Sequence, residues 1–358
     1  MESDARIRIA YVACAAYTGG AEKYIGLLAG GLDMKRFEPV LVTTGSPGLE
    51  PLRTTVARAG ARVEDAQGIL SLFRVLRRVR PDIVHVNMPG PFDCSYGLPA
   101  SIARLSGVRR IVTTEHLPMI RPFAKARVIR AVHMSHVSRF ITVSEDNRKH
   151  LHEKHGAPPE KIRVVLNGIT DPGRCAGIRE TGTGQIDLLV AGALEERKGH
   201  RVILSAMERL PGNIRLLIAG DGPMRGELES LLASGRYGGR VRLLGRVEEM
   251  HDLMSRSHIV VVPSLMEATP YVILEAMAAA RPVVASGVFG IPEQVEDGVT
   301  GILTRPGDDV SLADAILRLA SDPEMMRRAG EAGRRRYEER FTLRMSVEST
   351  ERIYDEVL

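Results

Sequence analysis

Two glutamates, Glu267 and Glu275, follow a short apolar run at 259–263 and are separated by seven residues. Pro270 favours the first turn of a helix, which places Glu267 in the preceding loop and Glu275 inside the helix. Carboxylates accept hydrogen bonds from sugar hydroxyls, so the pair could hold two sugars, one of them a ribose. On its own, a pair of glutamates is not specific to this chemistry.

Two cations, Arg197 and Lys198, precede Gly199 and follow an apolar run at 187–191. A guanidinium binds a phosphate as a two-pronged fork and an ammonium binds it as a point charge. The loop could therefore clamp a diphosphate at the start of a helix. A solvated charged loop is the alternative.

A glycine turn, Thr18-Gly19-Gly20-Ala21-Glu22, directly follows the first apolar run at 7–13. Glycines allow close approach of a ligand, and a helix N-terminus offers N–H groups to anions. A tight strand-to-helix turn would need the same residues. The turn lacks the G-x-G-x-x-G pattern, which disfavours a dinucleotide oxidoreductase.

The elements that must position these residues alternate between apolar strands and amphipathic helices. The predicted strands are 7–13, 40–44, 83–87, 111–114, 140–143 and 162–165, then 187–191, 215–219, 241–244, 259–263, 282–285 and 301–304. Helices are predicted at 22–32, 70–80, 199–209, 224–234 and 312–320. Continuous β-branched strands are typical of parallel sheets buried on both faces, so the fold class is α/β.

The chain divides at 167–185, a stretch with five glycines and no apolar period. We predict an N-terminal domain at 1–167, a second domain at 168–338 and a C-terminal helix at 339–358 that packs back on the first domain. Two open α/β sheets place ligands at the carboxyl ends of their strands, across a cleft. The three motifs above all follow strands, as this requires.

Composition and charge narrow the classes of function. Residues 1–166 hold 25 Lys and Arg against 15 Asp and Glu, whereas the remainder holds 24 against 29, so the first half meets something anionic. Aromatic residues are only 4% and Trp is absent, which disfavours base stacking on single-stranded nucleic acid. The three cysteines, Cys14, Cys94 and Cys175, form no metal or disulfide framework, and we expect a reducing, cytoplasmic location. No apolar run is long enough to span a bilayer.

Taken together, these motifs resemble the family-4 glycosyltransferases, which are retaining enzymes of the GT-B fold with two Rossmann-like domains. The resemblance covers nearly the whole chain. Its strongest elements are the two glutamates with Leu274-Glu275-Ala276-Met277-Ala278, the Arg197-Lys198-Gly199 loop, and Gly220-Asp221-Gly222-Pro223. Supporting matches are Gly19-Gly20-Ala21-Glu22, Thr114-Glu115-His116, Val143-Ser144-Glu145, Asn167-Gly168 and Gly290 with Pro292, Glu293 and Gly298.

The resemblance implies a role for each matching residue. Arg197 and Lys198 would neutralise the diphosphate of a nucleotide-sugar donor as it departs. Glu275 would hold the ribose hydroxyls, and Glu267 a hydroxyl of the transferred sugar. His116 matches the histidine that touches the 6-hydroxyl of that sugar near the reaction centre. Further donor contacts are expected from Gly19, Gly20, Arg246, Val247, Ala268 and Thr269.

The resemblance also sets the expected chemistry. The sugar would move with retention by front-face attack, since no carboxylate stands out as a covalent nucleophile. Neither a metal nor another cofactor is expected, and the acidic pairs Glu195-Glu196 and Asp308-Asp309 are predicted to be solvated. The loop Ala268-Thr269-Pro270 departs from the commoner Gly-Phe-Gly form, which puts the donor sugar in doubt. A UDP-sugar is the commonest donor, and a GDP-sugar stays open.

The basic first half is the acceptor side in such a fold. The predicted helix at 70–80 carries Arg74, Arg77, Arg78 and Arg80, and a later stretch carries Arg121, Lys125, Arg127 and Arg130. They favour either an anionic membrane surface at its inner face or an anionic soluble acceptor. The acceptor is expected to be a hydroxyl, lipid-linked or part of a cell-surface polysaccharide precursor. The remaining histidines are predicted to lie at the surface.

Three alternatives remain open at this stage. One is a nucleotide-sugar epimerase of the same fold, and another is a degenerate transferase that acts as a partner subunit. The third is a non-enzymatic protein that binds nucleic acid or another anionic polymer, although no recognition motif supports it.

Overall fold

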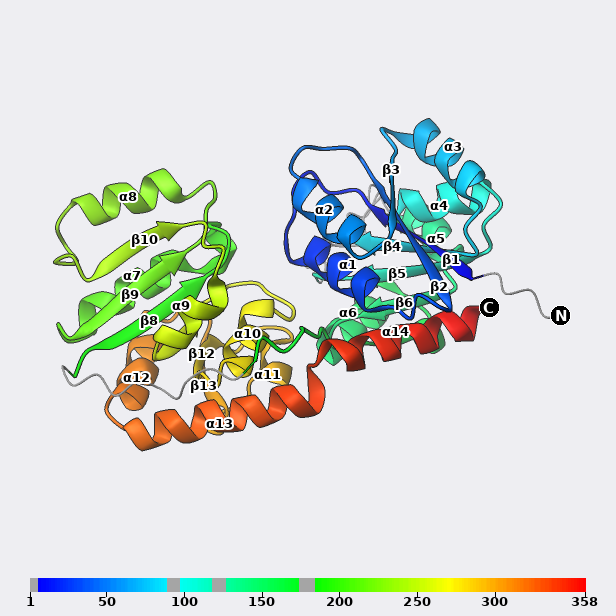
Figure 1. Ribbon diagram of the computed structural model, residues 1–358. Coiled ribbons are helices and arrows are strands. Elements are labelled where there is room, and N and C mark those ends of the chain that lie inside the picture. The colour runs from blue at the N-terminus through cyan, green and yellow to red at the C-terminus, as the bar shows by residue number, and fades with distance from the viewer. Residues whose placement is uncertain (1–5, 89–96, 118–126, 174–183) are drawn as a thin grey trace. The chain divides into compact units, whose positions relative to one another are not determined.

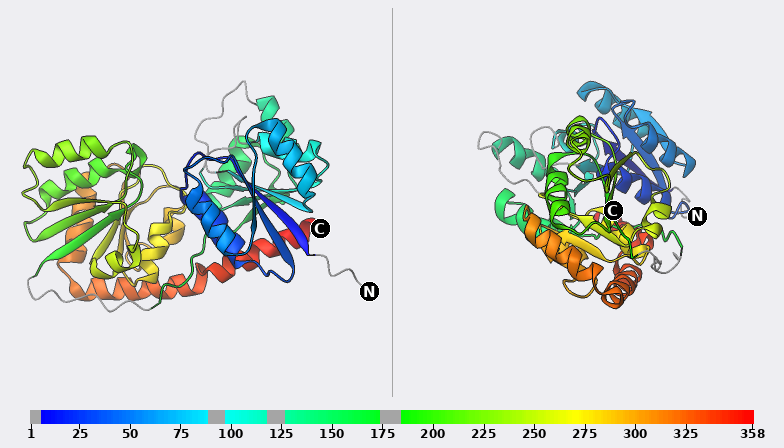
Figure 2. Two further views of the ribbon diagram at one scale, coloured as in Figure 1. Left: turned by 45° about the horizontal axis from the view of Figure 1, so that its top comes forward. Right: turned by 90° about the vertical axis from the view of Figure 1, so that its left-hand side faces the viewer.

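The computed structural model describes residues 6–88, 97–117, 127–173 and 184–358. The chain forms two compact units, of which unit 1 comprises residues 1–168 with 343–358 and unit 2 comprises residues 169–342 (Figure 1). Each unit contains one parallel sheet with helices on both faces (Figure 2, left). The predicted α/β class is therefore confirmed.

Unit 1 contains a seven-stranded sheet in the order β3-β2-β1-β4-β5-β6-β7, and all of its strand pairs are parallel. The order reverses between β1 and β4, because the chain first builds outward to β3 and then crosses back. The strands are β1 (Ile7–Ala13), β2 (Phe37–Thr43), β3 (Arg62–Asp65), β4 (Ile83–Met88), β5 (Arg110–Glu115), β6 (Arg139–Thr142) and β7 (Ile162–Val164).

The helices of unit 1 cover both faces of its sheet. Helix α1 packs against α2 and α14, whereas α4 packs against α3 and α5. The helices are α1 (Gly20–Gly31), α2 (Glu50–Arg58), α3 (Ile69–Val79), α4 (Leu98–Leu105), α5 (Arg127–Ser135), α6 (Glu145–His155) and α14 (Leu343–Val357), with a 3-10 turn at Pro159–Lys161. Right-handed crossovers put the helices on opposite faces once the strand order reverses.

The sequence pattern located every strand of unit 1 except β3. Its four residues, Arg62–Asp65, are charged or only partly buried. An edge strand pairs on one side only and is commonly short and charged, so it gives no apolar run to detect. The central strand β1 shows the opposite pattern, with Ile9–Ala13 fully buried.

The C-terminal helix α14 belongs to unit 1 and is anchored at both its centre and its end. The Tyr354 hydroxyl lies 3.0 Å from that of Tyr11 and 2.6 Å from Nδ1 of His85, all in the buried interior. At the end of the helix, Glu356 pairs with Arg139 and Arg163. A buried hydroxyl needs such partners, because leaving it unbonded costs about 1–3 kcal/mol.

Unit 2 contains a six-stranded parallel sheet in the order β10-β9-β8-β11-β12-β13. The order reverses between β8 and β11. The strands are β8 (Ile186–Ala191), β9 (Ile214–Ala219), β10 (Val241–Gly245), β11 (Ile259–Val262), β12 (Val283–Ser286) and β13 (Gly301–Thr304). The helices are α7 (His200–Arg209), α8 (Arg225–Ala233), α9 (Met250–Arg256), α10 (Tyr271–Ala278), α11 (Ile291–Gln294), α12 (Asp309–Ala320) and α13 (Pro323–Arg340), with a 3-10 turn at Glu196–Lys198.

Helix α13 packs closely on α10 through a glycine. A Cβ at Gly330 would lie 2.3 Å from the carbonyl oxygen of Ala280, so only glycine allows this approach. Beside it, Arg334 donates to the carbonyl of Ala278 and pairs with Asp171, which ties the start of unit 2 to its last helix. The contact stabilises the helix that carries Glu275.

No helix in the described part of the chain combines the length and the apolar character needed to cross a membrane.

Candidate functional site

The loops that follow β8 and β11 meet where the strand order of unit 2 reverses. The carbonyl of Arg197 accepts hydrogen bonds from the backbone N–H groups of Leu265 at 2.7 Å and Met266 at 3.3 Å. Two loops that are about 70 residues apart in sequence are thereby joined at the backbone level. A reversal of strand order leaves a crevice at the carboxyl ends of neighbouring strands, where α/β proteins bind ligands.

Glu267 gathers both cations of the first loop. Its Oε1 accepts from Nζ of Lys198 at 2.7 Å, and its Oε2 accepts from the guanidinium of Arg197 at 2.7 Å. Nε of Arg197 donates to Glu195 at 2.7 Å, so Glu195 belongs to this cluster and is not merely solvated as predicted. The side chain of Glu267 is only 11% exposed, whereas that of Arg197 is 29% exposed. We call Glu195, Arg197, Lys198 and Glu267 the charged cluster.

The charged cluster keeps capacity for a ligand. An ammonium has three N–H donors and a guanidinium has five, so the bonds to Glu267 and Glu195 do not exhaust Lys198 and Arg197. The two glutamates balance the two cations before any ligand binds. A diphosphate that reaches the cluster would add charge-assisted bonds to cations already held in place.

Glycines bring the backbone of three loops together beneath the cluster. Gly199 has φ of +71°, and a Cβ there would lie 1.9 Å from the carbonyl oxygen of Pro263. Gly220 has φ of +149°, and its Cβ would lie 1.8 Å from the carbonyl oxygen of Gly192. Only glycine is compatible with both the positive φ and the close approach. These loops follow β8, β9 and β11, so the carboxyl edge of the sheet is closely packed.

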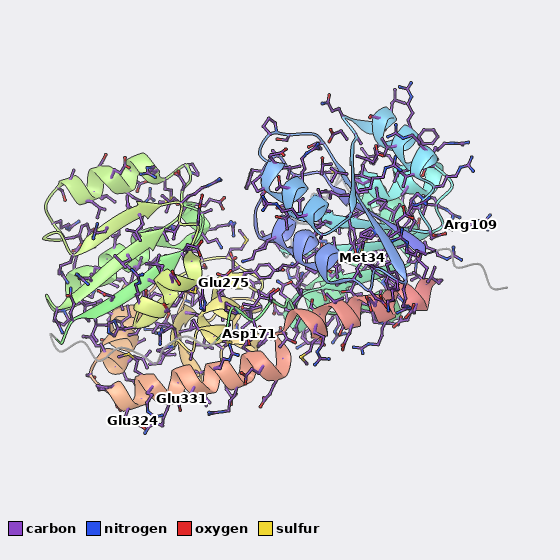
Figure 3. The ribbon with its side chains drawn as sticks, in the orientation of Figure 1. Met34, Arg109, Asp171, Glu275, Glu324 and Glu331 are labelled. Carbon is purple, nitrogen blue, oxygen red and sulfur yellow. The ribbon has the colours of Figure 1, made fainter. Side chains whose placement is uncertain are left out.

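The remaining predicted residues of unit 2 lie around this edge. Ala268 and Thr269 are buried between Glu267 and α10, and Glu275 is half-buried on α10 (Figure 3). Pro270 is the N-cap of α10, one position before the predicted first turn, and no side chain caps that N-terminus. Arg246 and Val247 follow β10 at the sheet edge, and among the described residues no hydrogen bond or ion pair joins them to the charged cluster.

In unit 1, His116 follows β5 and meets the end of β4. Its Nε2 lies 2.8 Å from Oδ1 of Asn87, and its backbone N–H donates to the carbonyl of Met88 at 3.2 Å. The ring of Tyr24 contacts the His116 ring edge-on, with centroids 4.9 Å apart. His116 is 8% exposed, and burial lowers its pKa to about 3. The imidazole is therefore neutral at neutral pH.

A second buried histidine, His85, lies in the same hydrogen-bonded region. Its Nε2 lies 2.7 Å from Oγ1 of Thr114, which also contacts the Tyr24 hydroxyl at 3.3 Å. Burial lowers the pKa of His85 to about 3 as well. Because Nδ1 of His85 contacts the Tyr354 hydroxyl, His85 links α14 to β5, the strand that directly precedes His116. We call Tyr11, Tyr24, His85, Asn87, Thr114, His116 and Tyr354 the neutral network.

The glycine turn of unit 1 begins helix α1. Gly19 is the N-cap of α1 and its N–H donates to Glu22 at 3.0 Å, while Gly20 opens the helix. Gly19 has a φ of −119° and Gly20 has a negative φ, so a left-handed conformation requires glycine at neither position. Glu22 is fully buried, and this burial raises the pKa of its carboxyl. These glycines place no side chain over the N-terminus of α1.

A cavity of about 150 Å³ opens in unit 1 at the carboxyl ends of β1 and β2. Its walls are mainly apolar side chains of β1, β2, α3 and α4, including Val12, Val42, Leu72 and Ile102. The described residues that line it carry no charge. The N-terminus of α3 adds Ile69 to its lining, and the next residue on that helix, Leu70, is 71% exposed.

Several surface predictions were wrong. His85, His133, His155, His200 and His258 are buried rather than exposed. Arg130 is also buried, so it does not add to a basic surface. Asp308 caps α12, whereas it was predicted to be merely solvated. Cys94, Cys175, Arg121 and Lys125 lie outside the described residues.

Sequence reasoning missed Asn87, His85 and Tyr354. Asn87 and His85 are polar residues within the apolar run of β4, and Tyr354 is the one aromatic residue of α14. A polar side chain in a strand that is buried on both faces must find partners, and this signal could have marked both strand residues. Tyr354 could not be paired with them, because more than 260 residues separate it from His85.

Two parallel-sheet, Rossmann-like units define the GT-B fold, and comparison with solved structures agrees. Anabaena HepE in complex with UDP matches 98% of this chain and 100% of its own, with a TM-score of 0.83 at 17% identity. Sucrose-phosphate synthase from Thermosynechococcus elongatus matches 98% and 99%, with a TM-score of 0.80 at 20% identity. At these identities the likeness establishes the fold.

The sequence comparisons establish the family. Residues 18–171 match the model of Glycosyltransferase Family 4, and residues 185–322 match that of Glycosyl transferases group 1. Glycogen synthase of Mycobacterium tuberculosis is 30% identical over 78% of this chain and 69% of its own. Alpha-D-kanosaminyltransferase of Streptomyces kanamyceticus is 29% identical over 74% and 75%. The chain belongs to the family-4, group 1 glycosyltransferases and is a glycosyltransferase.

Proposed function

We propose that this enzyme transfers a sugar from a UDP-sugar to a hydroxyl acceptor, with retention of configuration at the anomeric carbon. The observation that carries the proposal is the convergence of Arg197 and Lys198 on Glu267 at the carboxyl edge of unit 2. HepE, which has the same fold, has been solved with UDP and with UDP-glucose. A UDP-sugar is therefore the first donor to test.

In the proposed reaction, the charged cluster handles the departing diphosphate. Lys198 and Arg197 neutralise the negative charge that develops on the leaving oxygen, which is electrostatic stabilisation by groups already in position. Glu267 accepts a hydrogen bond from a hydroxyl of the transferred sugar, and its hydrogen bonds to Arg197 and Lys198 weaken as it does so. Glu275 holds the ribose from α10, and the backbone around Ala268 and Thr269 contacts the phosphates. Arg246 and Val247 contact the base.

The retention that we propose does not pass through a covalent intermediate on Glu267. A carboxylate that accepts hydrogen bonds from two cations at 2.7 Å is a weak nucleophile, because its lone pairs are already stabilised. We therefore assign no covalent intermediate to it. The acceptor hydroxyl attacks from the face that the diphosphate leaves, and a phosphate oxygen takes its proton. Gly19 and Gly20 leave room for the phosphates at the start of α1, and His116 contacts the transferred sugar.

On the acceptor side, we propose a hydroxyl compound that bears an apolar group, such as a lipid-linked precursor of a cell-surface glycan. The cavity beside β1 and β2 supports this, because its mainly apolar walls enclose about 150 Å³, which is enough for a group of roughly benzene size. Arg74 and Arg77 are exposed on α3 and Arg80 is exposed at its C-cap, and the N-terminus of this helix reaches that cavity. These arginines would bring the enzyme to an anionic membrane surface at the cytoplasmic side.

The test of the donor site is nucleotide release from a panel of UDP-, GDP-, ADP- and dTDP-sugars without acceptor. We expect wild type to hydrolyse one donor slowly, and Lys198→Ala to do so about 100- to 1,000-fold more slowly. The matched control is Arg201→Ala, which removes a nearby cation that pairs at the surface with Glu227. Full activity in Lys198→Ala would contradict the assignment, and an isomerised sugar nucleotide would indicate an epimerase.

A further inference from the structure

Asn87 lies at the carboxyl end of β4 and is 2% exposed. Its side-chain amide joins two segments that the sequence separates widely. Nδ2 donates to the carbonyl of Ala21 in the first turn of α1 at 3.1 Å, and Oδ1 lies 2.8 Å from Nε2 of His116. The amide therefore bridges the glycine turn and the histidine.

The bridge fixes where the proton of His116 resides. A backbone carbonyl only accepts hydrogen bonds, so the NH₂ group of Asn87 must face Ala21. Its carbonyl oxygen then faces His116, and because that oxygen also only accepts, Nε2 of His116 must carry the N–H. In a neutral imidazole the other nitrogen, Nδ1, is then an acceptor.

His85 shows what the bridge adds. Its two nitrogens contact the hydroxyls of Thr114 and Tyr354, and a hydroxyl can either donate or accept. Both tautomers of His85 can be satisfied, so its partners select neither. In the described part of the chain, the Asn87 amide bonds to the ring of His116 and not to that of His85. Only His116 therefore has a partner that selects one tautomer.

We propose that Asn87 is a positioning residue that holds His116 as the Nε2–H tautomer, so that His116 offers Nδ1 as a hydrogen-bond acceptor to the sugar. The sugar group that meets it must then supply a proton. A hydroxyl fits this requirement, whereas a carboxylate is repelled and a deoxy position leaves Nδ1 unpaired. The inference rests on the proposed function for the identity of the ligand, but the tautomer itself does not.

Other contacts restrain the His116 ring in the orientation that this needs. Tyr24 contacts the ring edge-on, and the backbone N–H of His116 is bound to Met88. The pKa of His116, lowered by burial, keeps the imidazole neutral, so Nδ1 does not become a donor at neutral pH. Within the described residues no side chain competes for Nδ1 through a hydrogen bond or ion pair.

The first experiment is ¹⁵N NMR of the histidine rings in the full-length enzyme, with His116 assigned by comparison with His116→Gln. We expect a protonated Nε2 and an unprotonated Nδ1 in wild type between pH 6 and 8. In Asn87→Leu, which keeps a similar size but offers no acceptor, we expect a mixture of tautomers. A protonated Nδ1 in wild type would overturn the proposal even if Asn87→Leu failed to fold.

The second experiment measures kcat/KM for UDP-glucose, its singly deoxygenated analogues and UDP-glucuronic acid. Wild type should lose about 10- to 100-fold for one deoxy position and at least as much for the uronic acid. Asn87→Leu should discriminate only a few-fold while its affinity for UDP stays unchanged. If NMR shows the expected tautomer but wild type does not discriminate among these donors, the proposed contact between Nδ1 and a sugar hydroxyl is wrong. If no donor is turned over, the proposed function is refuted, while the NMR result on the tautomer still stands.

Discussion

The two units place their candidate residues at equivalent points of the fold but build them from opposite kinds of interaction. In unit 2, the charged cluster lies beside the strand-order reversal between β8 and β11 and consists of ion pairs in partly open loops. In unit 1, the neutral network lies beside the reversal between β1 and β4 and consists of buried hydrogen bonds without a formal charge.

The contrast follows from what each site would have to do. Arg197 and Lys198 keep N–H donors beyond those bonded to the glutamates, so they can add hydrogen bonds to an anion when one arrives. A buried neutral hydrogen bond is costly to break, because the released group has no water to bond. The charged cluster is therefore suited to respond to a ligand, and the neutral network is suited to hold a fixed geometry.

The sharpest test of this contrast is Glu267→Gln, which leaves Arg197 and Lys198 without their shared counter-charge. We expect kcat/KM to fall about 100-fold or more, because a neutral amide holds the sugar hydroxyl and the cations poorly. Affinity for UDP alone should rise several-fold, since neither cation then faces the carboxylate of Glu267, although Arg197 keeps its pair with Glu195. Isothermal titration calorimetry measures the affinity, with Glu227→Gln at the surface pair as control. A parallel fall in affinity would mean that the cluster is a rigid scaffold.

Acid unfolding tests the neutral network as a whole. Burial holds the pKa of both His85 and His116 at about 3 in the folded chain. The unfolded chain protonates them near pH 6.5, so it binds more protons than the folded chain between pH 6.5 and 3, and stability falls as the pH is lowered through that window. Each histidine should lower the unfolding free energy by up to about 1.4 kcal/mol per pH unit.

Urea unfolding of wild type and His85→Gln at several pH values between 7.5 and 4.5 measures this slope. We expect the unfolding free energy of the variant to fall less steeply with acid than that of wild type, by up to about 1.4 kcal/mol per pH unit, because one titrating histidine is missing. Equal slopes in the two proteins would show that His85 is not held neutral in the folded state.

A smaller effect is expected from Tyr354→Phe, which removes one hydroxyl from the neutral network. His85 and Tyr11 would each lose a buried partner, and we expect the unfolding free energy to fall by about 1–3 kcal/mol. Tyr17→Phe, at a tyrosine that is 62% exposed, is the control and should change stability little. Denaturant titration measures the unfolding free energy of both variants. If Tyr354→Phe lowers it no more than the control does, the network contributes little to stability.

Much of the fold could be predicted from the sequence, because parallel strands buried on both faces give continuous apolar runs. Each predicted strand overlaps an observed one, and only the charged edge strand β3 was missed. The placement of Glu267 before α10 and Glu275 within it also followed from local pattern, since a proline restricts where a helix begins. Such features depend on neighbours within a few residues.

Contacts between distant segments could not be predicted in the same way. The sequence indicated that Arg197, Lys198 and Glu267 were chemically capable, but their pairing depends on β8 and β11 being neighbours in the sheet. Strand order is set by crossovers and packing over the whole unit, which no local pattern contains.

The sequence by itself therefore determined the fold class, the family resemblance and the residue types available for chemistry. Only the tertiary structure decided that Glu267 neutralises both cations, that five histidines thought to be exposed are buried, and that Asn87 faces both Ala21 and His116. The physical reason is that burial and hydrogen-bond partners are properties of the folded chain. A residue's protonation, its tautomer and its free donors depend on neighbours that only folding brings together.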